Sequence, residues 1–568
     1  MLEARIGVFI CHCGNNIGGV VDVPAVVEYS RTLPYVVYAE DNAYTCSESG
    51  ISSIKAIIKE YQLNRVLVAS CTPRTHEPLF KNTCEEAGLN RYLFEFVNIR
   101  EQCSWIHMER KEEATEKAKE LVKMGVAKIV WLEPQEEFEG QVYPSALVIG
   151  GGIAGMSSAL ALANQGFEVH LVEKEKELGG LLKSINKLFP TNIDASKLLK
   201  PIIQKVKKHD KIKLHMPATI KDASGYIGDF NISIDINGNE DKFKVGTIIV
   251  ATGAEEFKPD QYGYGKMSNV VTQLELEERL KKGTKWVEEL GGVAIINCVG
   301  CRIPERSYCS RFCCLTAIKN AALIKEINPS SNVYVLHRDL MTYGVEFEDY
   351  YRKAMETGVR FLRYTLKNPP QVLGTNKADG VKVYDELMGR ELELPSDMIV
   401  LTTPLISAID NELFSKLLKV PLSDGKFFLE AHLKLRPVEF ATDGIYVCGS
   451  ARWPADIRES ISQAYAAASK AAIPMSKGFV KVEAITSFVN RDACVGCGTC
   501  ILACPFNAIE IQVSDGKRSA NINEALCKGC GNCAATCLSG AIQQKGYTDL
   551  QVLSMVSTLA GRSSFETA

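Results

Sequence analysis

The cysteines near the C-terminal end of the chain recur at a fixed spacing. Four of them follow the pattern C-x2-C-x2-C-x3-C, and the same pattern returns 33 residues later. This is the spacing of bacterial ferredoxins, in which three close thiolates hold one [4Fe–4S] cluster and the fourth reaches the other cluster. The pattern therefore predicts one cluster on Cys494, Cys497, Cys500 and Cys537, and a second on Cys527, Cys530, Cys533 and Cys504. A pair of zinc knuckles is the alternative, although knuckles usually have only two close cysteines per half.

A glycine-rich turn lies between a predicted strand and a predicted helix, from Gly150 to Gly155. Glycines permit a tight turn and let a pyrophosphate approach the N-terminus of the following helix, where free N–H groups favour anions. A second strand, residues 169–172, ends at Glu173, where a carboxylate can hold a ribose hydroxyl. These features predict a dinucleotide-binding fold rather than an ordinary tight turn between a strand and a helix.

Together with later segments, this turn resembles the flavoproteins that have two dinucleotide-binding domains, the thioredoxin reductase family in particular. In that family the strand-end glutamate, a following Gly-Gly, an A-T-G segment and a C-terminal segment line FAD. The matching residues here are Gly150, Gly152, Ile153, Ala154, Gly155, Glu173, Lys174, Gly179, Gly180, Ala251, Thr252, Gly253, Gly449 and Ser450. Ser450 departs from the family, which commonly has aspartate there. The resemblance implies FAD rather than NAD as the cofactor.

The expected second nucleotide-binding turn carries cysteines in place of glycines. After a predicted strand at residues 293–298 come Cys298, Cys301, Cys309, Cys313 and Cys314. A [4Fe–4S] cluster is the economical interpretation, because thiolates satisfy a soft iron site. The alternatives are a dithiol formed by Cys298 and Cys301, or a group of reduced structural thiols. Direct binding of NAD(P)H at this turn is not expected.

A third set of cysteines is scattered through the first 135 residues, where short strand-like and helix-like segments alternate. The alternation predicts a small α/β domain with a parallel sheet. Because the carboxyl ends of parallel strands meet at one edge of a sheet, cysteines at those ends could converge there. The candidates are Cys11, Cys13, Cys46 and Cys71, with Cys103 as a fifth. Buried free cysteines also behave as small apolar residues, so a purely structural interpretation stays open.

Long ungapped motifs make the chain similar to the HdrA-like family, the iron–sulfur flavoprotein subunits of soluble heterodisulfide reductase complexes in methanogenic archaea and many bacteria. The motifs are residues 11–17, 70–77, 98–105, 298–300 and 308–314, together with the flavin turn and the ferredoxin pair. The resemblance implies a middle cluster on Cys298, Cys309, Cys313 and Cys314, with Cys301 as an extra thiol. It implies an N-terminal cluster on Cys11, Cys13, Cys46 and Cys71, and therefore four clusters in all.

One departure from that family concerns an insertion. Many members carry an additional ferredoxin pair shortly after the flavin turn, but residues 185–220 of this chain contain no cysteine. The chain therefore resembles a short form of the family, with fewer clusters through which electrons can leave.

The resemblance also implies a function. It implies a subunit that passes electrons from a partner donor through FAD and clusters toward a disulfide of the CoM-S-S-CoB type, toward ferredoxin, or toward both by flavin-based electron bifurcation. The implied partners are other heterodisulfide reductase-type subunits, a donor such as a hydrogenase or formate dehydrogenase, and ferredoxin, in an oligomer of complexes. No catalytic residue beyond FAD is assigned. Two alternatives stay open: a self-contained thioredoxin-reductase-like disulfide oxidoreductase, and a non-branching electron relay of another complex.

The composition excludes several other classes of protein. Of the 568 residues 46% are hydrophobic and 23% are charged, which is typical of a globular protein. The net charge of −3 leaves no basic excess for binding nucleic acid. The 20 cysteines fall in tight clusters, and the chain begins without the ordered regions of a signal peptide. Clustered cysteines of this kind indicate metal or redox sites in a reducing, cytoplasmic compartment, and no membrane span is expected.

These sites require an α/β fold of several parts. The expected parts are an N-terminal α/β domain (1–135), a thioredoxin-reductase-like double Rossmann domain (145–477) whose second fold, at about 290–400, is degenerate, a 2[4Fe–4S] ferredoxin domain (485–545) and a C-terminal tail (546–568). A charged helix expected at about 102–124 and the acidic stretch 133–139 are interpreted as a linker. The tail is expected to form a short amphipathic helix at 548–559.

Overall fold

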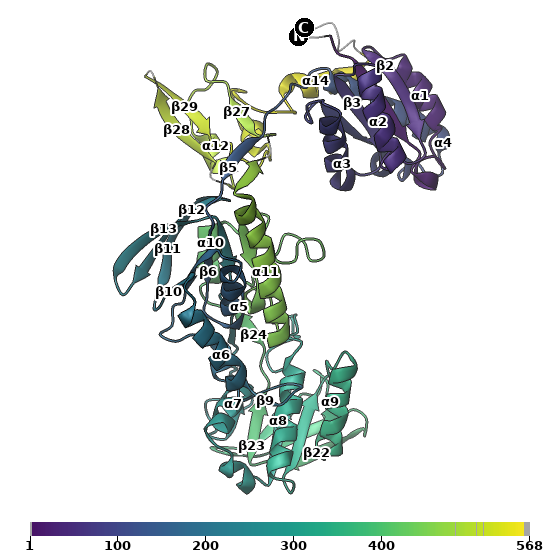
Figure 1. Ribbon diagram of the computed structural model, residues 1–568. Helices are drawn as coiled ribbons and strands as arrows, with labels where there is room; N and C mark the ends of the chain where they lie inside the picture. The colour runs from purple at the N-terminus through teal and green to yellow at the C-terminus, as the bar shows by residue number, and fades with distance from the viewer. Residues whose placement is uncertain (1–2, 483, 507, 515, 562–568) are drawn as a thin grey trace. The chain divides into compact units, whose positions relative to one another are not determined.

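The structure is a computed structural model, and it describes residues 3–482, 484–506, 508–514 and 516–561. The chain forms two compact units, which can be followed by colour in Figure 1. The first unit combines residues 1–139 with residues 481–568, and the second unit consists of residues 140–480. The short strands β5 (Phe138–Gln141) and β26 (Phe479–Val482) lie where the chain passes from one unit to the other.

The N-terminal part of the first unit is a four-stranded parallel sheet in the order β2-β1-β3-β4. Its strands are β1 (Ile6–Cys11), β2 (Val36–Asn42), β3 (Arg65–Ser70) and β4 (Phe94–Asn98). The helices are α1 (Val23–Arg31), α2 (Glu48–Glu60), α3 (Pro73–Glu86) and α4 (Lys111–Ile129). Every residue of β1 is buried, as expected for a strand that is covered on both faces of a parallel sheet.

The prediction that the charged segment near residues 102–124 serves as a linker is wrong. This segment contributes to α4, a helix that packs against β3 and β4 and belongs to the core of the domain. Ala114, Ala118, Val122 and Val126 recur at intervals of four residues and are completely buried. That spacing places them on one face of a helix, while the charged residues occupy the other face.

The C-terminal part of the first unit contains the repeated cysteine pattern. Its two antiparallel pairs of strands are β27 (Ser487–Val489) with β30 (Ile542–Gln544), and β28 (Ile509–Ser514) with β29 (Lys517–Ile522). Two short helices, α12 (Thr499–Ala503) and α13 (Asn532–Ala535), each begin within a cysteine motif. The two halves therefore repeat the same elements in the same order.

The expected helix in the tail is confirmed as α14 (Asp549–Leu559), which begins with a capping box formed by Thr548 and Gln551. This helix packs against α4 within the same unit. Gln551 Nε2 donates to the carbonyl of Trp131 at 2.9 Å, and Ser554 Oγ donates to that of Ala127 at 3.2 Å. Helix α14 thus packs onto the N-terminal domain.

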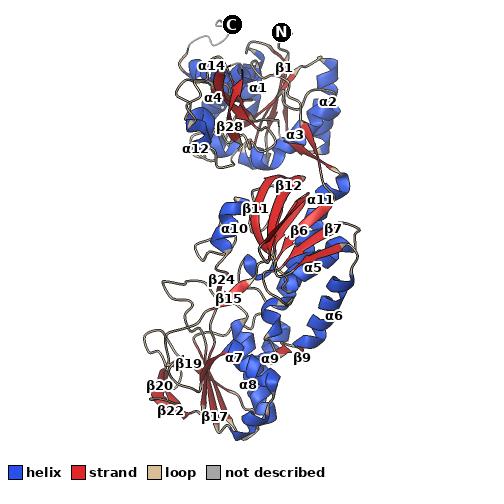
Figure 2. Cartoon of the chain, turned by 90° about the vertical axis from the view of Figure 1, so that its left-hand side faces the viewer, coloured by secondary structure: helices blue, strands red, loops and turns tan. Residues whose placement is uncertain are grey.

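The second unit begins with a five-stranded parallel sheet in the order β10-β7-β6-β14-β25, of which β6 and β7 are labelled in Figure 2. Its strands are β6 (Ser145–Ile149), β7 (Glu168–Val172), β10 (Ile212–His215), β14 (Thr247–Val250) and β25 (Ile445–Val447). The helices are α5 (Ile153–Ala163), α6 (Ala195–Lys208), α10 (Asn411–Leu418) and α11 (Ile457–Lys477). An antiparallel sheet of β11 (Thr219–Tyr226), β12 (Asp229–Ile236) and β13 (Asn239–Val245) accompanies them, as does the pair β8 (Lys187–Leu188) and β9 (Ile193–Asp194).

A second five-stranded parallel sheet in this unit has the order β16-β23-β17-β18-β19. Its strands are β16 (Val270–Thr272), β17 (Gly292–Ile296), β18 (Asn332–His337), β19 (Arg360–Arg363) and β23 (Met398–Leu401). Its helices are α7 (Gln273–Lys282), α8 (Cys313–Ile327) and α9 (Val345–Glu356). The remaining strands are β15 (Ala254–Glu256), β20 (Gln371–Gly374), β21 (Ala378–Asp385), β22 (Arg390–Pro395) and β24 (Leu405–Ser407). The second nucleotide-binding-type fold is therefore inserted into the first, between β14 and β25, and the unit has the double fold that the sequence predicts.

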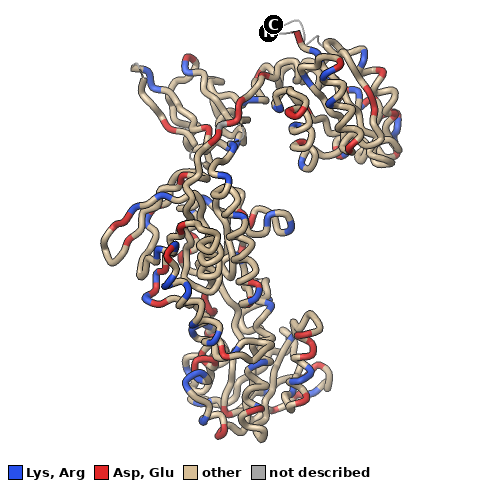
Figure 3. Tube along the Cα trace, in the orientation of Figure 1, with Lys and Arg blue, Asp and Glu red and all other residues tan. Residues whose placement is uncertain are grey.

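Positions occupied by Lys or Arg and positions occupied by Asp or Glu are interspersed along the trace of each unit, as Figure 3 shows. Among the residues that the structure describes, none of the helices combines the length and the apolar character that crossing a bilayer would require.

Candidate functional site

The glycine turn after β6 cannot accept larger residues at two of its positions. Gly150 has a φ of +111°, and a Cβ atom there would lie 2.4 Å from the carbonyl oxygen of Ala251. A Cβ atom on Gly155 would lie 1.8 Å from the carbonyl oxygen of Gly150. The first glycine thus makes the turn, and the later one lets α5 pack directly against it.

Glu173, at the end of β7, is held rigidly beside this turn. Its two carboxylate oxygens accept hydrogen bonds from the backbone N–H groups of Gly151 at 2.6 Å and Glu175 at 2.8 Å. The side chain is buried, with 8% of its surface exposed. The carboxylate is therefore preorganised at the position where a strand-end acid is expected to hold a ribose.

A cavity of about 570 Å³ opens in front of the turn. Twelve of the predicted flavin residues line it: Gly150, Gly152, Ile153, Ala154, Glu173, Lys174, Gly179, Gly180, Ala251, Thr252, Gly253 and Ser450. The lining does not include Gly155 or Gly449. Gly449 has a φ of +69°, and a Cβ atom there would lie 2.7 Å from that of Ala154, so these two glycines allow close packing behind the cavity.

One wall of the cavity contains a buried ion pair that the sequence did not reveal. Lys319 on α8 contacts Glu277 on α7, and both residues line the cavity. Asn320 donates to Glu277 at 2.9 Å, and Lys319 Nζ also donates to the carbonyl of Lys187 at 2.8 Å. Burial lowers the pKa of the Lys319 amine. A lysine in an otherwise apolar stretch of a predicted helix was the available signal.

The N-terminal end of α11 forms another part of the wall. Asp456 caps this helix of 21 residues, and Ile457 and Arg458 in its first turn line the cavity. The positive end of the helix dipole therefore points toward the cavity and favours negative charge there.

The middle cysteines converge beside the second sheet. The loop after β17 carries Cys298 and Cys301, and the first turn of α8 carries Cys313 and Cys314. Burial raises the pKa of Cys313 well above its usual value, and the neighbouring thiols of Cys314, Cys309 and Cys298 raise it further. A hydrogen bond with Cys298 raises the pKa of Cys301, and burial and the charges of Cys313 and Cys309 raise it further, so all five thiols of this segment lie near one another.

Arginine side chains hold the loop that carries Cys298. Arg338 is buried and donates to the carbonyls of Cys301 at 2.6 Å and Arg302 at 2.9 Å. A hydrogen bond from the Cys301 thiol, together with the charges of Arg338 and Arg302, lowers the pKa of Cys298 to about 6 despite burial. The loop thus stabilises a negative charge on this sulfur, as metal ligation of a thiolate requires.

The cysteine group and the large cavity share a residue. Cys313 belongs to the convergent thiols, and it also lines the cavity together with its neighbours Phe312 and Thr316. A redox group on these thiols would therefore lie against whatever molecule fills the cavity.

The N-terminal cysteines also converge, at the carboxyl edge of their sheet. Cys11 ends β1, Cys71 directly follows β3, and both raise the pKa of Cys13 and of Cys46, in addition to the larger effect of burial. The Sγ atom of Cys11 accepts a hydrogen bond from the N–H of Thr45 at 3.4 Å. The structure thus brings together the four residues that were expected to meet.

Two neighbours of this group have other partners. The thiol of Cys103, the fifth candidate, is buried and donates to the carbonyl of Ala114 at 3.0 Å, away from the other four. The Nε2 atom of His12 is paired with a carboxylate oxygen of Asp41 at 2.6 Å.

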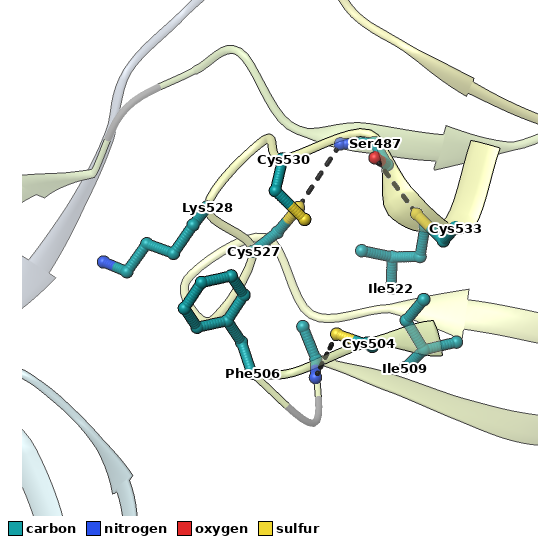
Figure 4. Close-up of a pocket in the computed structure, with 10 residues that line it drawn as sticks. Ser487, Cys504, Phe506, Ile509, Ile522, Cys527, Lys528, Cys530 and Cys533 are labelled. Carbon is teal, nitrogen blue, oxygen red and sulfur yellow. Dashed lines mark hydrogen bonds between the residues drawn. The ribbon is translucent and has the colours of Figure 1, made fainter. Parts of the chain in front are cut away.

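In the ferredoxin part, one pocket is lined by four cysteines from both halves of the repeat. Figure 4 shows Cys527, Cys530 and Cys533 facing Cys504, which comes from the first half. Two backbone N–H groups donate to these sulfurs, that of Ala508 to Cys504 and that of Ser487 to Cys527, both at 3.4 Å. The grouping is the one that the ferredoxin spacing predicts.

The other four cysteines of the repeat differ in exposure. Cys494, Cys500 and Cys537 take part in the small core of this domain, whereas Cys497 is exposed. The Sγ atom of Cys494 accepts a hydrogen bond from the N–H of Ala520 at 3.4 Å, and a hydrogen bond with Thr499 lowers the pKa of Cys497.

Among the residues that the structure describes, no group of three or more His, Cys, Asp or Glu side chains is arranged to hold a single metal ion.

Two family models match separate parts of the chain. Residues 144–471 match the family described as pyridine nucleotide-disulphide oxidoreductase, and residues 493–541 match the 4Fe-4S dicluster domain. The solved structure of T. acidophilum thioredoxin reductase is similar over 59% of this chain and 99% of that chain, with 18% identity and a TM-score of 0.41.

Relatives from methanogenic archaea cover nearly the whole chain. The chain is 39% identical to an iron-sulfur A-type subunit of the CoB--CoM heterodisulfide reductase of Methanopyrus kandleri, with 98% of each chain covered. It is 37% identical, again with 98% of each covered, to the A-type subunit of the H(2)/formate:CoB-CoM heterodisulfide,ferredoxin reductase of Methanococcus maripaludis. Both alignments have more positions than this chain has residues, so both relatives contain segments that it lacks. At this identity and coverage, the chain belongs to the HdrA family, the iron–sulfur oxidoreductase subunits of heterodisulfide reductase.

Proposed function

We propose that this chain is the FAD- and iron–sulfur-containing electron-transfer subunit of a cytoplasmic heterodisulfide reductase-type complex. Electrons enter from a partner donor and leave through [4Fe–4S] clusters toward a disulfide of the CoM-S-S-CoB type, toward ferredoxin, or toward both by electron bifurcation. Family membership supports this proposal, and the names of the relatives include a heterodisulfide, hydrogen or formate, and ferredoxin. The proposed partners are the other subunits of such a complex and a hydrogenase or formate dehydrogenase that serves as donor, and the complexes associate into an oligomer.

The cavity beside the glycine turn fits FAD in size and chemistry. Its volume of about 570 Å³ lies within the range of cofactor sites, about 300–1,000 Å³. The N-terminus of α5 would receive the pyrophosphate, and the fixed carboxylate of Glu173 would receive the ribose. When bound, the flavin supplies the ability to accept two electrons and to release them one at a time. The N-terminal end of α11 favours the negative charge that reduction brings into the cavity.

One observation carries the proposal furthest: Cys313 belongs both to the middle cysteine group and to the wall of the flavin cavity. We assign the middle cluster to Cys298, Cys309, Cys313 and Cys314. Lowering of the Cys298 pKa supports ligation there, because only the thiolate binds iron. The position of Cys313 would let an electron pass between cluster and flavin without crossing a layer of protein.

The remaining clusters are assigned to the other three groups of cysteines. The N-terminal cluster is assigned to Cys11, Cys13, Cys46 and Cys71, whose convergence at one sheet edge supports it. The ferredoxin clusters are assigned to Cys494, Cys497, Cys500 and Cys537, and to Cys527, Cys530, Cys533 and Cys504. The pocket that Cys504 shares with the second half supports the exchange of ligands between halves.

A thiol–disulfide oxidoreductase is the second candidate. The hydrogen bond between Cys301 and Cys298, and the Cys298 pKa of about 6, are features of a reactive dithiol. Both side chains are buried, however, with 8% of Cys298 and none of Cys301 exposed. A disulfide substrate needs direct access to the attacking sulfur, so the burial of both residues favours the cluster.

The measurement that tests the proposal is the content of iron, acid-labile sulfide and FAD in the full chain after anaerobic purification. About sixteen irons and one FAD per chain, as four cubane clusters require, are the expected result. About eight irons with one FAD would restrict the clusters to the ferredoxin part and favour the dithiol candidate. A Cys301→Ser variant separates the two further, because it should keep the iron content and would abolish a dithiol reaction.

A further inference from the structure

The two halves of the ferredoxin repeat carry different residues at one equivalent position. Ser487 precedes Ala520 by the same 33 residues that separate Cys494 from Cys527. The N–H of Ser487 donates to Cys527 Sγ at 3.4 Å, and the N–H of Ala520 donates to Cys494 Sγ, also at 3.4 Å. Each residue thus supports the first cysteine of the opposite half through the same backbone hydrogen bond.

The side chains at this position break the symmetry. The Sγ atom of Cys533 lies 3.3 Å from Ser487 Oγ, a contact that Figure 4 draws as a dashed line. Ala520 has only a methyl group, so Cys500, the counterpart of Cys533, receives no hydroxyl from that side. Ser487 and Ala520 are both only 2% exposed, which makes replacement of the missing hydrogen bond by bulk water unfavourable.

The direction of the Ser487 hydrogen bond depends on the state of the sulfur. With a free thiol, Cys533 donates to Ser487 Oγ. A thiolate that is bound to iron has no proton, so the hydroxyl of Ser487 must then be the donor. In the part of the chain that the structure describes, Ser487 Oγ has no other hydrogen-bond partner.

Hydrogen bonds to cluster sulfurs raise the reduction potential, because reduction adds negative charge that the donors stabilise. We infer that Ser487 is a positioning residue that raises the potential of the cluster held by Cys527, Cys530, Cys533 and Cys504, and that the Ser487/Ala520 difference makes the two ferredoxin clusters inequivalent. The inference rests on the proposed function in that both clusters must be present.

The first cluster has hydroxyl neighbours of a different kind. Thr499 Oγ1 lies 3.4 Å from Cys497 Sγ, and Ser539 Oγ lies 3.6 Å from Cys537 Sγ. Both pairs lie at exposed positions, where water can take the place of a lost hydroxyl. Thr499→Val is therefore a suitable control that removes a surface hydroxyl from the first cluster and leaves the second cluster unchanged.

The test is a redox titration of the full chain, monitored by electron paramagnetic resonance. Ser487→Ala should move one ferredoxin midpoint to a more negative potential and leave the other in place. Ala520→Ser should move the other midpoint to a more positive potential. Ser487→Thr, which keeps the hydroxyl, should leave both midpoints near those of the parent chain, and the Ser487→Ala/Ala520→Ser double variant should combine both shifts.

Each outcome bears on a separate claim. If the parent chain lacks the iron for two ferredoxin clusters, the proposed function fails. If the iron is complete but Ser487→Ala leaves all midpoints in place, the inference about Ser487 is overturned. If Ser487→Ala loses iron, Ala520→Ser decides: a positive shift of one midpoint supports the inference, and no shift overturns it.

Discussion

Lys319 and Glu277 form an ion pair in which the side chains are only 2% and 1% exposed, on the wall of the cavity that is proposed to hold FAD. Buried pairs of this kind are weak contributors to net stability, because desolvation offsets their attraction. Removing only one partner is strongly destabilising, since it leaves the other charge buried and unpaired.

Lys319→Met should therefore destabilise the second unit by about 3–5 kcal/mol, because Glu277 would be left without its cation. The Lys319→Met/Glu277→Leu double variant should recover most of that loss. The unfolding midpoint in urea, followed by the release of FAD, measures the effect. The exposed pair Lys242–Glu240, which does not line the cavity, is the matched control, and Lys242→Met should cost no more than about 1 kcal/mol. Equal losses at the two pairs would contradict the expectation.

Two glycines of the cavity turn should respond differently to alanine. Gly155→Ala places a methyl group 1.8 Å from the carbonyl oxygen of Gly150, so the turn must move and the unit should lose both FAD and stability. A Cβ atom on Gly152 has no protein atom within 4 Å, but it would extend into the cavity that this residue lines. Gly152→Ala should weaken FAD binding while thermal unfolding of the FAD-free chain stays unchanged. Identical behaviour of the two variants would argue against the assignment of the cavity to FAD.

Acid should destabilise the second unit through its buried histidines. Burial lowers the pKa of His170 to about 4, and the neighbouring His215 and Lys213 lower it further, although a hydrogen bond to Glu168 opposes the shift. Because an unfolded histidine titrates near 6.5, the unfolded chain takes up the proton first. The stabilisation is complete above pH 6.5 and is lost as the pH falls toward 4, by about 2 kcal/mol between pH 7 and pH 5.

A His170→Phe variant checks this pH dependence. Urea unfolding at pH 7 and at pH 5 should differ less in the variant than in the parent chain. His337, whose pKa burial also lowers to about 4, should keep part of the dependence. His432→Gln, at an exposed position, should retain the full difference, and a pH dependence that is unchanged in His170→Phe would disprove the assignment.

The docking of α14 on α4 should depend on Ser554, which is 5% exposed and donates to the carbonyl of Ala127. Ser554→Arg should separate the two helices and reduce the protection of the α14 amides against hydrogen exchange by at least about tenfold, equal to about 1.4 kcal/mol. Leu553→Arg changes the neighbouring residue, which is 60% exposed, and should leave the protection unchanged. If Leu553→Arg has the larger effect, the helix docks through its other face.

The sequence predicted best where chemistry depends on short spacing or on a strand ending. The ferredoxin spacing groups Cys504 with Cys527, Cys530 and Cys533, and these four cysteines line one pocket. The N-terminal cysteines were grouped because parallel strands end at one edge of a sheet. In the structure, Cys11 and Cys71 lie close enough to Cys13 and Cys46 to raise the pKa of both. Their roles as ligands remain predictions.

The sequence was least informative about residues that are distant along the chain but in contact in the fold, and about which face of a charged helix is buried. Lys319 and Glu277 lie 42 residues apart, and neither belongs to a short motif. In α4 the many charged residues suggested an exposed linker, although Ala114 and Ala118 mark a face that can approach a sheet closely. Small apolar residues at intervals of four predict a buried helix face, whatever the number of charged residues on the opposite face.

The place of Cys504 also has a consequence for how this part of the chain can evolve. Duplicated segments usually diverge as two independent copies, and one copy can be deleted without harm to the other. Here the second copy borrows one sulfur from the first, because Cys504 lines the pocket of Cys527, Cys530 and Cys533. Under the proposed ligand sets, deleting either copy would leave the surviving copy one ligand short, so the two copies can be lost only together.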